Sequence, residues 1–347
     1  MSGGALEVLQ GGAGCTVQDA GRLGHRHEGV ARSGWLDPWL AGAANALVGN
    51  PPGAAGLEWR GPALRLRVRS GPVRVAVAGG VARWSDGPDA PSQPLAPWCS
   101  AVLATGACLH LAALPGGCAC LAVSGGVQVP QVLGSRATHG RTRLGGLDGR
   151  MLQPGDVLAC DRLAGDDARV WCAAAPPAWH DAGPIRVLPG PQADHFTPAA
   201  QATLTDAPWR VTPALDRMGI RLAGPALVHV DAAATDIVSD GVVPGAIQVP
   251  ADGQPIVLLA DAQTVGGYPK IATVISADLP RLAQARAGDT LRFAVVDGHQ
   301  ARAAAQQVRQ RWQAWCAALR RGRPAGGVDE AALYRDNLIS GMLRAEL

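Results

Sequence analysis

The sequence of 347 residues contains a single lysine, Lys270, although it has 31 lysine and arginine residues in all. A Walker A loop needs its lysine after a glycine-rich turn and directly before serine or threonine, whereas Lys270 stands between Pro269 and Ile271. Attachment of biotin or lipoate needs an exposed lysine at a hairpin tip flanked by methionine, and no such segment exists. The chain is therefore neither a self-contained P-loop ATPase nor a carrier of covalently attached biotin.

Signals for secretion, membrane insertion and structural disulfides are also lacking. Residues 1–9 show no basic region followed by an apolar stretch, and no run approaches the roughly 18 apolar residues that a membrane helix needs. The eight cysteines form no Cys-x-x-Cys pair, and Cys118 and Cys120 lie two apart in an apolar run, which favours buried free thiols on one side of a strand over zinc or a disulfide. Reduced cysteines without a signal peptide predict a cytoplasmic protein with no membrane contact.

The net charge is small and evenly distributed. It is formally +3, and the arginines are spread thinly along the chain, so we expect no nucleic-acid partner. The densest basic run, residues 320–323, is interpreted as a group of cations at a helix end. His25 and His27 form the only close histidine pair, with no third ligand at helical or hairpin spacing, so we expect no metal site.

Short apolar runs separated by glycine and proline predict a mainly β fold. The chain has 45 glycines and 27 prolines, and residues 64–69 and 73–77 alternate apolar and polar side chains as half-buried strands do. Further strands are expected at 109–114, 119–123, 185–188, 247–249, 256–260, 271–275 and 291–296. Many short strands with such turns favour barrels or sandwiches.

Three helices are expected, at residues 37–48, 197–204 and 301–320. In the third helix one face carries large apolar side chains, which we expect to pack on the protein's own body. These are Val308, Trp312, Trp315, Cys316 and Leu319.

A short repeated segment suggests that the chain has two related halves. Gly-Pro-Ala-Leu occurs at residues 61–64 and again at 224–227, each time before an expected strand, and residues 173–178 resemble a linker. The division that follows is an N-terminal half at 1–175, a C-terminal half at 180–298 and a helical extension at 299–347.

Three polar, glycine-containing segments are candidates for the site. The first spans residues 16–37, where Gln18, Asp19, Arg22, His27 and Ser33 mix acceptors, a guanidinium, an imidazole and a hydroxyl, as a site for a polar substrate would. Solvated loop polarity explains the same segment equally well.

The second segment, residues 135–150, combines Arg136 with a glycine-rich loop that is able to bind a carboxylate or phosphate, although a plain turn accounts for it too. The third segment holds Asp261, Gly266, Gly267, Tyr268 and Lys270 between two apolar strands. Since arginine fills every other basic position, a lysine here indicates a need for a compact ammonium group or a tunable pKa.

These segments together resemble a known family. Collinear blocks at 16–22, 33–37, 49–51, 57–58, 134–136, 216–219, 241–245, 254–258 and 266–272 are similar to the carboxyltransferase-domain family. That family includes the C-type subunit of bacterial 5-oxoprolinase, allophanate-hydrolase-subunit-2 proteins and antagonists of a sporulation kinase inhibitor. The resemblance implies two cyclophilin-like β-barrel halves and a partner chain, the B-type (kinase-inhibitor-like) subunit, with the A-type subunit as a further partner.

Three functions follow from the resemblance. The first is the C-type subunit of an ATP-dependent 5-oxoprolinase-type hydrolase that opens a small lactam to glutamate, with ATP shared with the partner subunit. In this function, Lys270 and Arg136 hold a carboxylate or phosphate, while Asp19 and Asp261 act as polar or acid/base partners. The second is the carboxyltransferase component of a biotin-dependent, urea-carboxylase-like system. The third is a non-enzymatic antagonist of a kinase inhibitor.

The sequence departs from the family pattern near the first polar segment, which leaves the substrate open. His25 stands where an aromatic residue is usual, Glu28 where an apolar one is, and Trp35 where a small one is. Asp240 replaces a usual glutamate farther along the chain.

Overall fold

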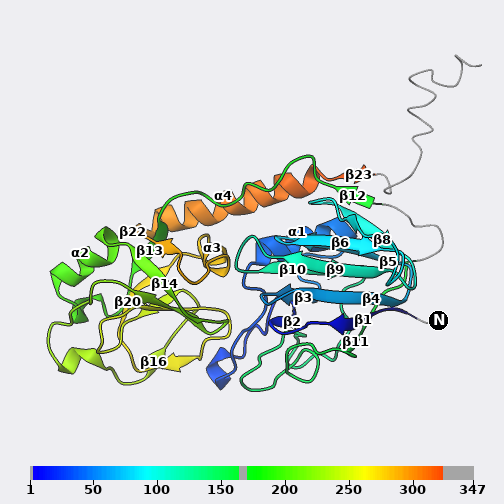
Figure 1. The fold of residues 1–347 in the computed structure, drawn as a ribbon. Coiled ribbons are helices and arrows are strands. Elements are labelled where there is room, and N and C mark those ends of the chain that lie inside the picture. The colour runs from blue at the N-terminus through cyan, green and yellow to red at the C-terminus, as the bar shows by residue number, and fades with distance from the viewer. Residues whose placement is uncertain (1–2, 164–169, 323–347) are drawn as a thin grey trace, which may run out of the picture.

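The computed structural model describes residues 3–163 and 170–322, which form two β-rich halves with one long helix running across both (Figure 1). The helices are α1 (Pro38–Val48), α2 (Pro198–Asp206), α3 (Leu279–Ala283) and α4 (Gly298–Ala317), with 3-10 turns η1 (Arg26–Glu28), η2 (Ala193–His195) and η3 (Ala233–Thr235). The expected mainly β fold with few short helices and a C-terminal helix is confirmed.

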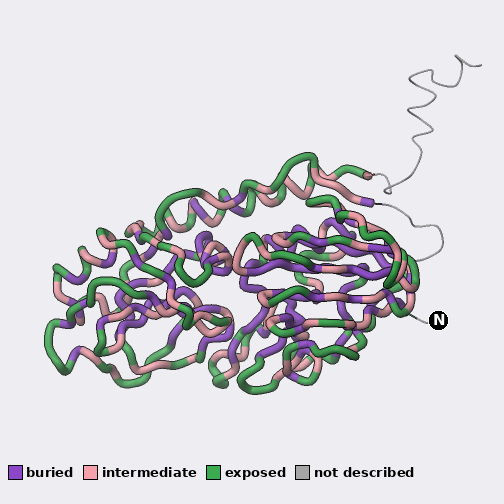
Figure 2. Tube along the Cα trace, viewed as in Figure 1, coloured by how far each residue is buried: buried purple, intermediate pink, exposed green. Residues whose placement is uncertain are grey.

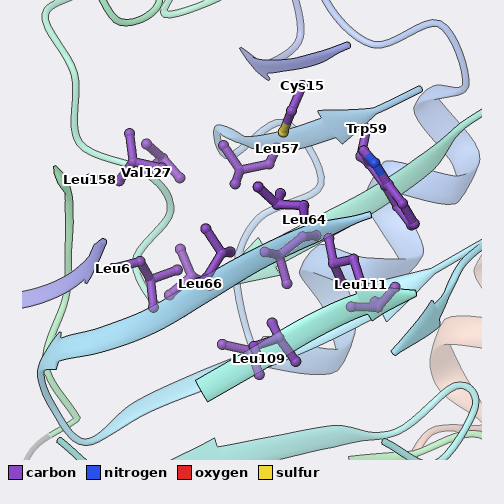
Figure 3. Close-up of a cluster of buried hydrophobic side chains, with 14 of the residues drawn as sticks. Leu6, Cys15, Leu57, Trp59, Leu64, Leu66, Leu109, Leu111, Val127 and Leu158 are labelled. Atoms are coloured by element: carbon purple, nitrogen blue, oxygen red, sulfur yellow. The ribbon is translucent and has the colours of Figure 1, made fainter. Parts of the chain in front are cut away.

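The N-terminal half is built from two antiparallel sheets. One has the order β11 (Val157–Cys160), β1 (Gly4–Gln10), β4 (Leu64–Ser70), β9 (Cys108–Ala113), β6 (Val81–Ser85) and β7 (Gln93–Pro94). The other has the order β2 (Cys15–Gln18), β3 (Gly56–Trp59), β10 (Ala119–Val123), β5 (Val73–Ala78) and β8 (Ser100–Leu103). Their inner faces share one hydrophobic core, to which Leu6, Leu66 and Leu109 belong (Figure 3).

Helix α1 covers the outer face of the second sheet. Its Leu40 and Leu47 pack against Ala76 of β5 and Cys120 of β10. Strand β5 is therefore buried on both faces, including Arg74, whereas its alternating sequence predicts a half-buried strand. The prediction of a polar outer face on β5 was wrong because a helix lies where solvent was expected.

The C-terminal half is one strongly curved sheet. Its order is β21 (Thr290–Leu291), β14 (Trp209–Leu215), β15 (Gly219–Ala223), β18 (Ile256–Leu258), β17 (Ala246–Gln248), β20 (Lys270–Val274), β13 (Ile185–Pro189) and β22 (Phe293–Val295). The two edge strands are separated in sequence only by Arg292, so the sheet curls until its edges nearly meet. A separate ribbon pairs β16 (Asp240–Gly241) with β19 (Val265–Gly266).

Helix α4 joins the two halves, and Figure 2 shows its outer side exposed. Its Val308 is buried, and the ring centroids of Trp312 and Trp39 of α1 lie 5.8 Å apart. Trp315 packs edge-on against Trp98 and Trp179, so the expected packing of this face on the protein's own body is confirmed. The helix begins three residues earlier than predicted because Asp297 and Gln300 form a capping box.

The chain after α4 returns to the N-terminal half as a strand. β23 (Arg320–Gly322) pairs with β12 (Val170–Cys172), so Arg320 and Arg321 lie in a strand rather than at a helix end. Arg323 of the same basic run lies outside the described residues. The division into three domains stays a prediction.

One expectation about the cysteines was wrong. Cys99 and Cys172 form a disulfide, although 73 residues separate them. An antiparallel bridge sets the two opposite each other, with Cα atoms 4.1 Å apart, and no local spacing reveals such a pairing. Cys118 and Cys120 are buried free thiols, as predicted.

Two further features concern the described residues alone. None of their helices is long and apolar enough to cross a membrane. No cluster of three or more histidine, cysteine, aspartate or glutamate side chains placed to hold a metal occurs among residues 3–163 and 170–322.

We predict that Leu66→Ala lowers the free energy of unfolding by about 2–5 kcal/mol, because the buried side chain leaves a cavity in the N-terminal core. Chemical denaturation monitored by circular dichroism measures the change. Leu23→Ala is the control, since Leu23 is 65% exposed, and should change the free energy by less than about 0.5 kcal/mol. Equal effects of the two substitutions would contradict the assigned core.

Candidate functional site

A buried arginine holds the two halves together. Arg217 lies in the turn between β14 and β15 and donates to Asp261 through Nε and Nη2, at 2.9 and 3.0 Å. The same guanidinium donates from Nη1 to Glu58 of β3 and from Nη2 to the carbonyl oxygen of Gly34 at 2.6 Å. Three residues from both halves therefore converge on one cation.

Electrostatics keep this cation charged. Burial by itself lowers the pKa of the Arg217 guanidinium, but the carboxylates of Glu58 and Asp261 outweigh the burial and the net pKa is raised. A buried charge is tolerated where its partners satisfy it in this way. Arg217 thus fixes the position of the carboxylates rather than exchanging protons.

A cavity of about 890 Å³ lies against this arginine at the junction of the halves. Its charged lining comprises Arg60, Arg141, Arg217, Arg286, Asp216 and Asp261. Four arginines thus face two aspartates in the lining, and one further carboxylate, that of Glu58, shares Arg217 with Asp261. The cavity has a surplus of positive charge suited to an anionic ligand.

The free cations of this cavity are Arg141 and Arg286. No hydrogen bond or ion pair with another described residue engages either guanidinium, and both residues are exposed. Arg60 donates only a long bond of 3.4 Å to the carbonyl oxygen of Gly117. These side chains are available to a carboxylate or phosphate.

His139 lies in the wall of the same cavity. Its Nε2 is 3.2 Å from the carbonyl oxygen of Asp261, and its Nδ1 is 2.6 Å from the hydroxyl of Thr142. The imidazole is thereby held between the halves, next to the Arg217–Asp261 pair.

Asp19 organises a loop rather than presenting a free carboxylate. Its Oδ1 accepts from the Gly21 amide at 2.8 Å and the Ser135 hydroxyl at 2.6 Å, and its Oδ2 accepts from the Arg136 amide at 2.5 Å. Gln18 lies beside it, donating to the Thr138 carbonyl and accepting from the Gly34 amide. The first and second polar segments are thus brought together.

Arg22 is fully buried in the same network. It donates from Nε to the carbonyl oxygen of Val132 at 3.2 Å and from Nη2 to that of Ala137, while its Nη1 has no partner among the described residues. Burial lowers the pKa of this guanidinium, and nearby Asp19 and Asp261 oppose that effect.

Ser33 and Asp19 line a second cavity of about 500 Å³, which also contacts α4. The side chain of Arg136 lines neither of these two cavities. It donates to the carbonyl oxygen of Val129 at 2.9 Å and to the side chain of Gln128 at 3.0 Å. His27 is exposed, with a side-chain exposure of 76%, next to Glu28.

Lys270 forms a separate cluster. Its buried ammonium donates to Asp240 Oδ2 at 2.7 Å and to the carbonyl oxygen of Gly241 at 3.3 Å. The hydrogen bond from Lys270, followed by the one from the Gly241 amide, lowers the pKa of the Asp240 carboxyl.

Apart from Asp261, the third segment lies next to this pair. Gly266 pairs with Asp240 in the ribbon, Gly267 accepts from the Ile237 amide, and the Tyr268 carbonyl accepts from Gln248. A Cβ on Gly266 would lie 2.7 Å from the side-chain amide nitrogen of Gln248, so a larger residue there would displace that side chain. None of these residues lines either junction cavity, and the Lys270 ammonium donates to Asp240 and Gly241 rather than to any residue of the first two segments.

Three residues of the junction were not predicted: Arg217, Glu58 and His139. A signal did exist for Glu58, because a carboxylate between Leu57 and Trp59 in a strand buried throughout requires a cationic partner. Arg217 and Glu58 also lie in the blocks that carry the family resemblance. Nothing local distinguishes His139, since its partners are 122 and 3 residues away.

Comparison with known proteins identifies the family. Residues 28–295 match the carboxyltransferase domain family, subdomain A and B, and the chain belongs to this family, as its sequence blocks predicted. It is 36% identical over 291 residues to the C subunit of 5-oxoprolinase from Escherichia coli K12, covering 83% of this chain and 90% of that one. It is 34% identical to the C subunit of 5-oxoprolinase from Haemophilus influenzae, covering 84% and 91%.

The fold is also found in a larger enzyme. The crystal structure of Kluyveromyces lactis urea carboxylase matches with a TM-score of 0.78 and 27% identity over 90% of this chain. The chain spans only 29% of that protein.

We predict that Arg217→Met lowers the free energy of unfolding by about 3–5 kcal/mol, because Glu58 and Asp261 are left buried without a cation. Thermal and chemical denaturation measure the loss. Arg221→Met is the matched control, since its ion pair with Asp252 is exposed and should contribute at most about 1 kcal/mol. Adding Glu58→Gln to Arg217→Met should restore part of the stability, and no recovery would argue against charge as the cause.

We predict that Lys270→Met raises the pKa of Asp240 towards its ordinary value, as measured by a carboxyl carbon-13 NMR titration. Because the folded-state pKa of Asp240 is lowered, its stabilising contribution is present above the unfolded-state pKa and is lost as pH falls through the folded-state value. The pKa of Asp156, lowered by Arg150, serves as the control and should not move. An unchanged titration of Asp240 would show that Lys270 is not its partner in solution.

Proposed function

We propose that the chain is the C-type subunit of an ATP-dependent 5-oxoprolinase-type complex and that it binds a small anionic lactam in the 890 Å³ junction cavity. The observation that carries the proposal is the surplus of arginine there, with Arg141 and Arg286 free of partners among the described residues. The similarity to the C subunits of two bacterial 5-oxoprolinases supports it. The proposed partners are the A-type and B-type subunits of such a complex.

The chemistry of the lactam fits this cavity. 5-Oxoproline carries a carboxylate, which a guanidinium binds through two parallel hydrogen bonds. Its ring carbonyl gains negative charge on its oxygen as the amide is activated, and preorganised cations stabilise that charge. We propose that one arginine holds the carboxylate while the others face the ring carbonyl.

The same guanidinium groups suit phosphate oxygens, so we propose that Arg141 and Arg286 also contact ATP that is shared with a partner subunit. ATP, when bound, supplies the phosphoryl group that activates the carbonyl. Arg217 does not contact the substrate in this proposal. It positions Asp261 and His139 in the cavity wall.

The test is the ATP-dependent hydrolysis of 5-oxoproline to glutamate by the chain reconstituted with the A-type and B-type subunits. Arg286→Ala should raise the KM for 5-oxoproline about tenfold or more, because a charge-assisted contact with the substrate is lost. Arg302→Ala is the matched control, since Arg302 is exposed on α4 outside the cavity, and should leave KM unchanged. Equal KM values for both variants would refute the cavity as the lactam site.

Lys270 provides a second arm of the same assay. If Lys270 is catalytic, Lys270→Ala abolishes turnover while the chain stays folded. Full turnover by this variant would restrict Lys270 to holding Asp240 and the ribbon in place.

The match to urea carboxylase favours one alternative, a carboxyltransferase component that acts with a separate biotin carrier. Lys270 is the only lysine of the chain and is 2% exposed, which supports placing the biotin on another protein. Transfer of carboxylate from a carboxylated carrier to urea, with no activity on 5-oxoproline, would favour this alternative.

A further inference from the structure

The second junction cavity differs in character from the first. Its volume is about 500 Å³, and its walls come from the N-terminal half, the C-terminal half and α4. Three indoles line it, from Trp35, Trp39 and Trp312. Such an apolar cavity of this size is typical of sites for small molecules with a flat, apolar body.

Polar atoms in its wall have no partner. The hydroxyl of Ser33 and the indole N–H of Trp35 are both buried and form no hydrogen bond with any described residue. Ser33 also adopts a backbone φ of +54°, which is costly for a residue other than glycine. Because both polar atoms lack accessible surface, a ligand in the cavity would contact the ring of Trp35 rather than its N–H. The backbone strain at Ser33 is of the kind that persists at functional sites.

Charge at the opening specifies the ligand further. Arg32 and Arg309 line the cavity and are exposed, and the Arg309 guanidinium has no partner within residues 3–163 and 170–322. The one carboxylate in the lining, Asp19, already accepts three hydrogen bonds. Two guanidinium groups thus face one carboxylate in the lining, which leaves an excess of positive charge.

We propose that this cavity binds a small molecule with a flat, apolar body and one acid group. The body lies between the indoles of α1, α4 and the Ser33–Trp35 segment, and the acid group meets Arg309 and Arg32. This site goes beyond the proposed lactam chemistry, because a small polar lactam does not cover three indoles.

Isothermal titration calorimetry of the full chain with 2-naphthoate tests the proposal, with 2-naphthamide as the neutral analogue. We expect saturable binding of 2-naphthoate at one site with a Kd below about 1 mM. Arg309→Gln should weaken it about threefold to fivefold, as expected of an exposed ion pair, and should remove the preference over 2-naphthamide. Ala305→Phe, which places a ring in the cavity, should weaken binding more than about tenfold.

Two substitutions on the same helix serve as matched controls. Arg302→Gln and Ala314→Phe change exposed residues outside the cavity and should leave binding within about twofold of the parent chain. Absence of saturable binding, or equal binding of the acid and the amide, would overturn the proposal. So would unchanged binding in Ala305→Phe. If Ala305→Phe does not fold, Arg309→Gln and the amide decide the question. The assay uses the chain alone without turnover, so its failure is distinct from a failure of the lactam proposal.

Discussion

The junction of the two halves depends on the buried guanidinium of Arg217. Glu58 and Asp261 come from different halves and are both buried, so neither is tolerable without a cation between them. Because the guanidinium is planar, it reaches both carboxylates and the Gly34 carbonyl at once. The two cavities beside it are formed by segments that this contact holds in place.

The two cavities lie against neighbouring residues of one short segment. Asp261 lines the arginine-rich cavity, whereas Leu259 and Ala260 line the indole-rich one. The amide of Ser33 donates to the Ala260 carbonyl, which ties the segment to the N-terminal half. Consecutive residues of one segment thus line two different cavities, one rich in arginine and the other rich in indole rings.

Much of the fold was predictable because its signals are local. The alternation in β4 and the caps of α1 and α2, at Asp37 and Thr197, identify those elements from neighbouring residues alone. Long-range partners were not predictable in the same way. The Cys99–Cys172 disulfide and the helix that covers β5 depend on topology, and α3 is too short to give a periodic signal.

The sequence predicted the segments of the candidate site but not how they are arranged in space. The sequence indicated that Gln18, Asp19 and Ser33 belong together. In the structure Gln18 accepts from the Gly34 amide and Asp19 from the Ser135 hydroxyl, whereas Ser33 donates through its amide to Ala260. The sequence did not indicate that Lys270 lies in a separate cluster with Asp240, because distance between segments is a property of the folded sheet. The cation at the junction is Arg217, and because almost every basic residue of this chain is arginine, the residue type alone does not single it out.

Helix α4 packs on both halves and so restricts their movement relative to each other. Near its middle Val308 belongs to one hydrophobic cluster with Ile275 and Ala277 of the C-terminal half. Nearer its end Trp312 packs on Trp39 and Trp315 packs on Trp98, both in the N-terminal half. A hinge motion that widened the junction on this side would have to break these contacts together. The segments that carry the arginines of the arginine-rich cavity are therefore placed before a ligand binds, and little binding energy is spent on moving the two halves.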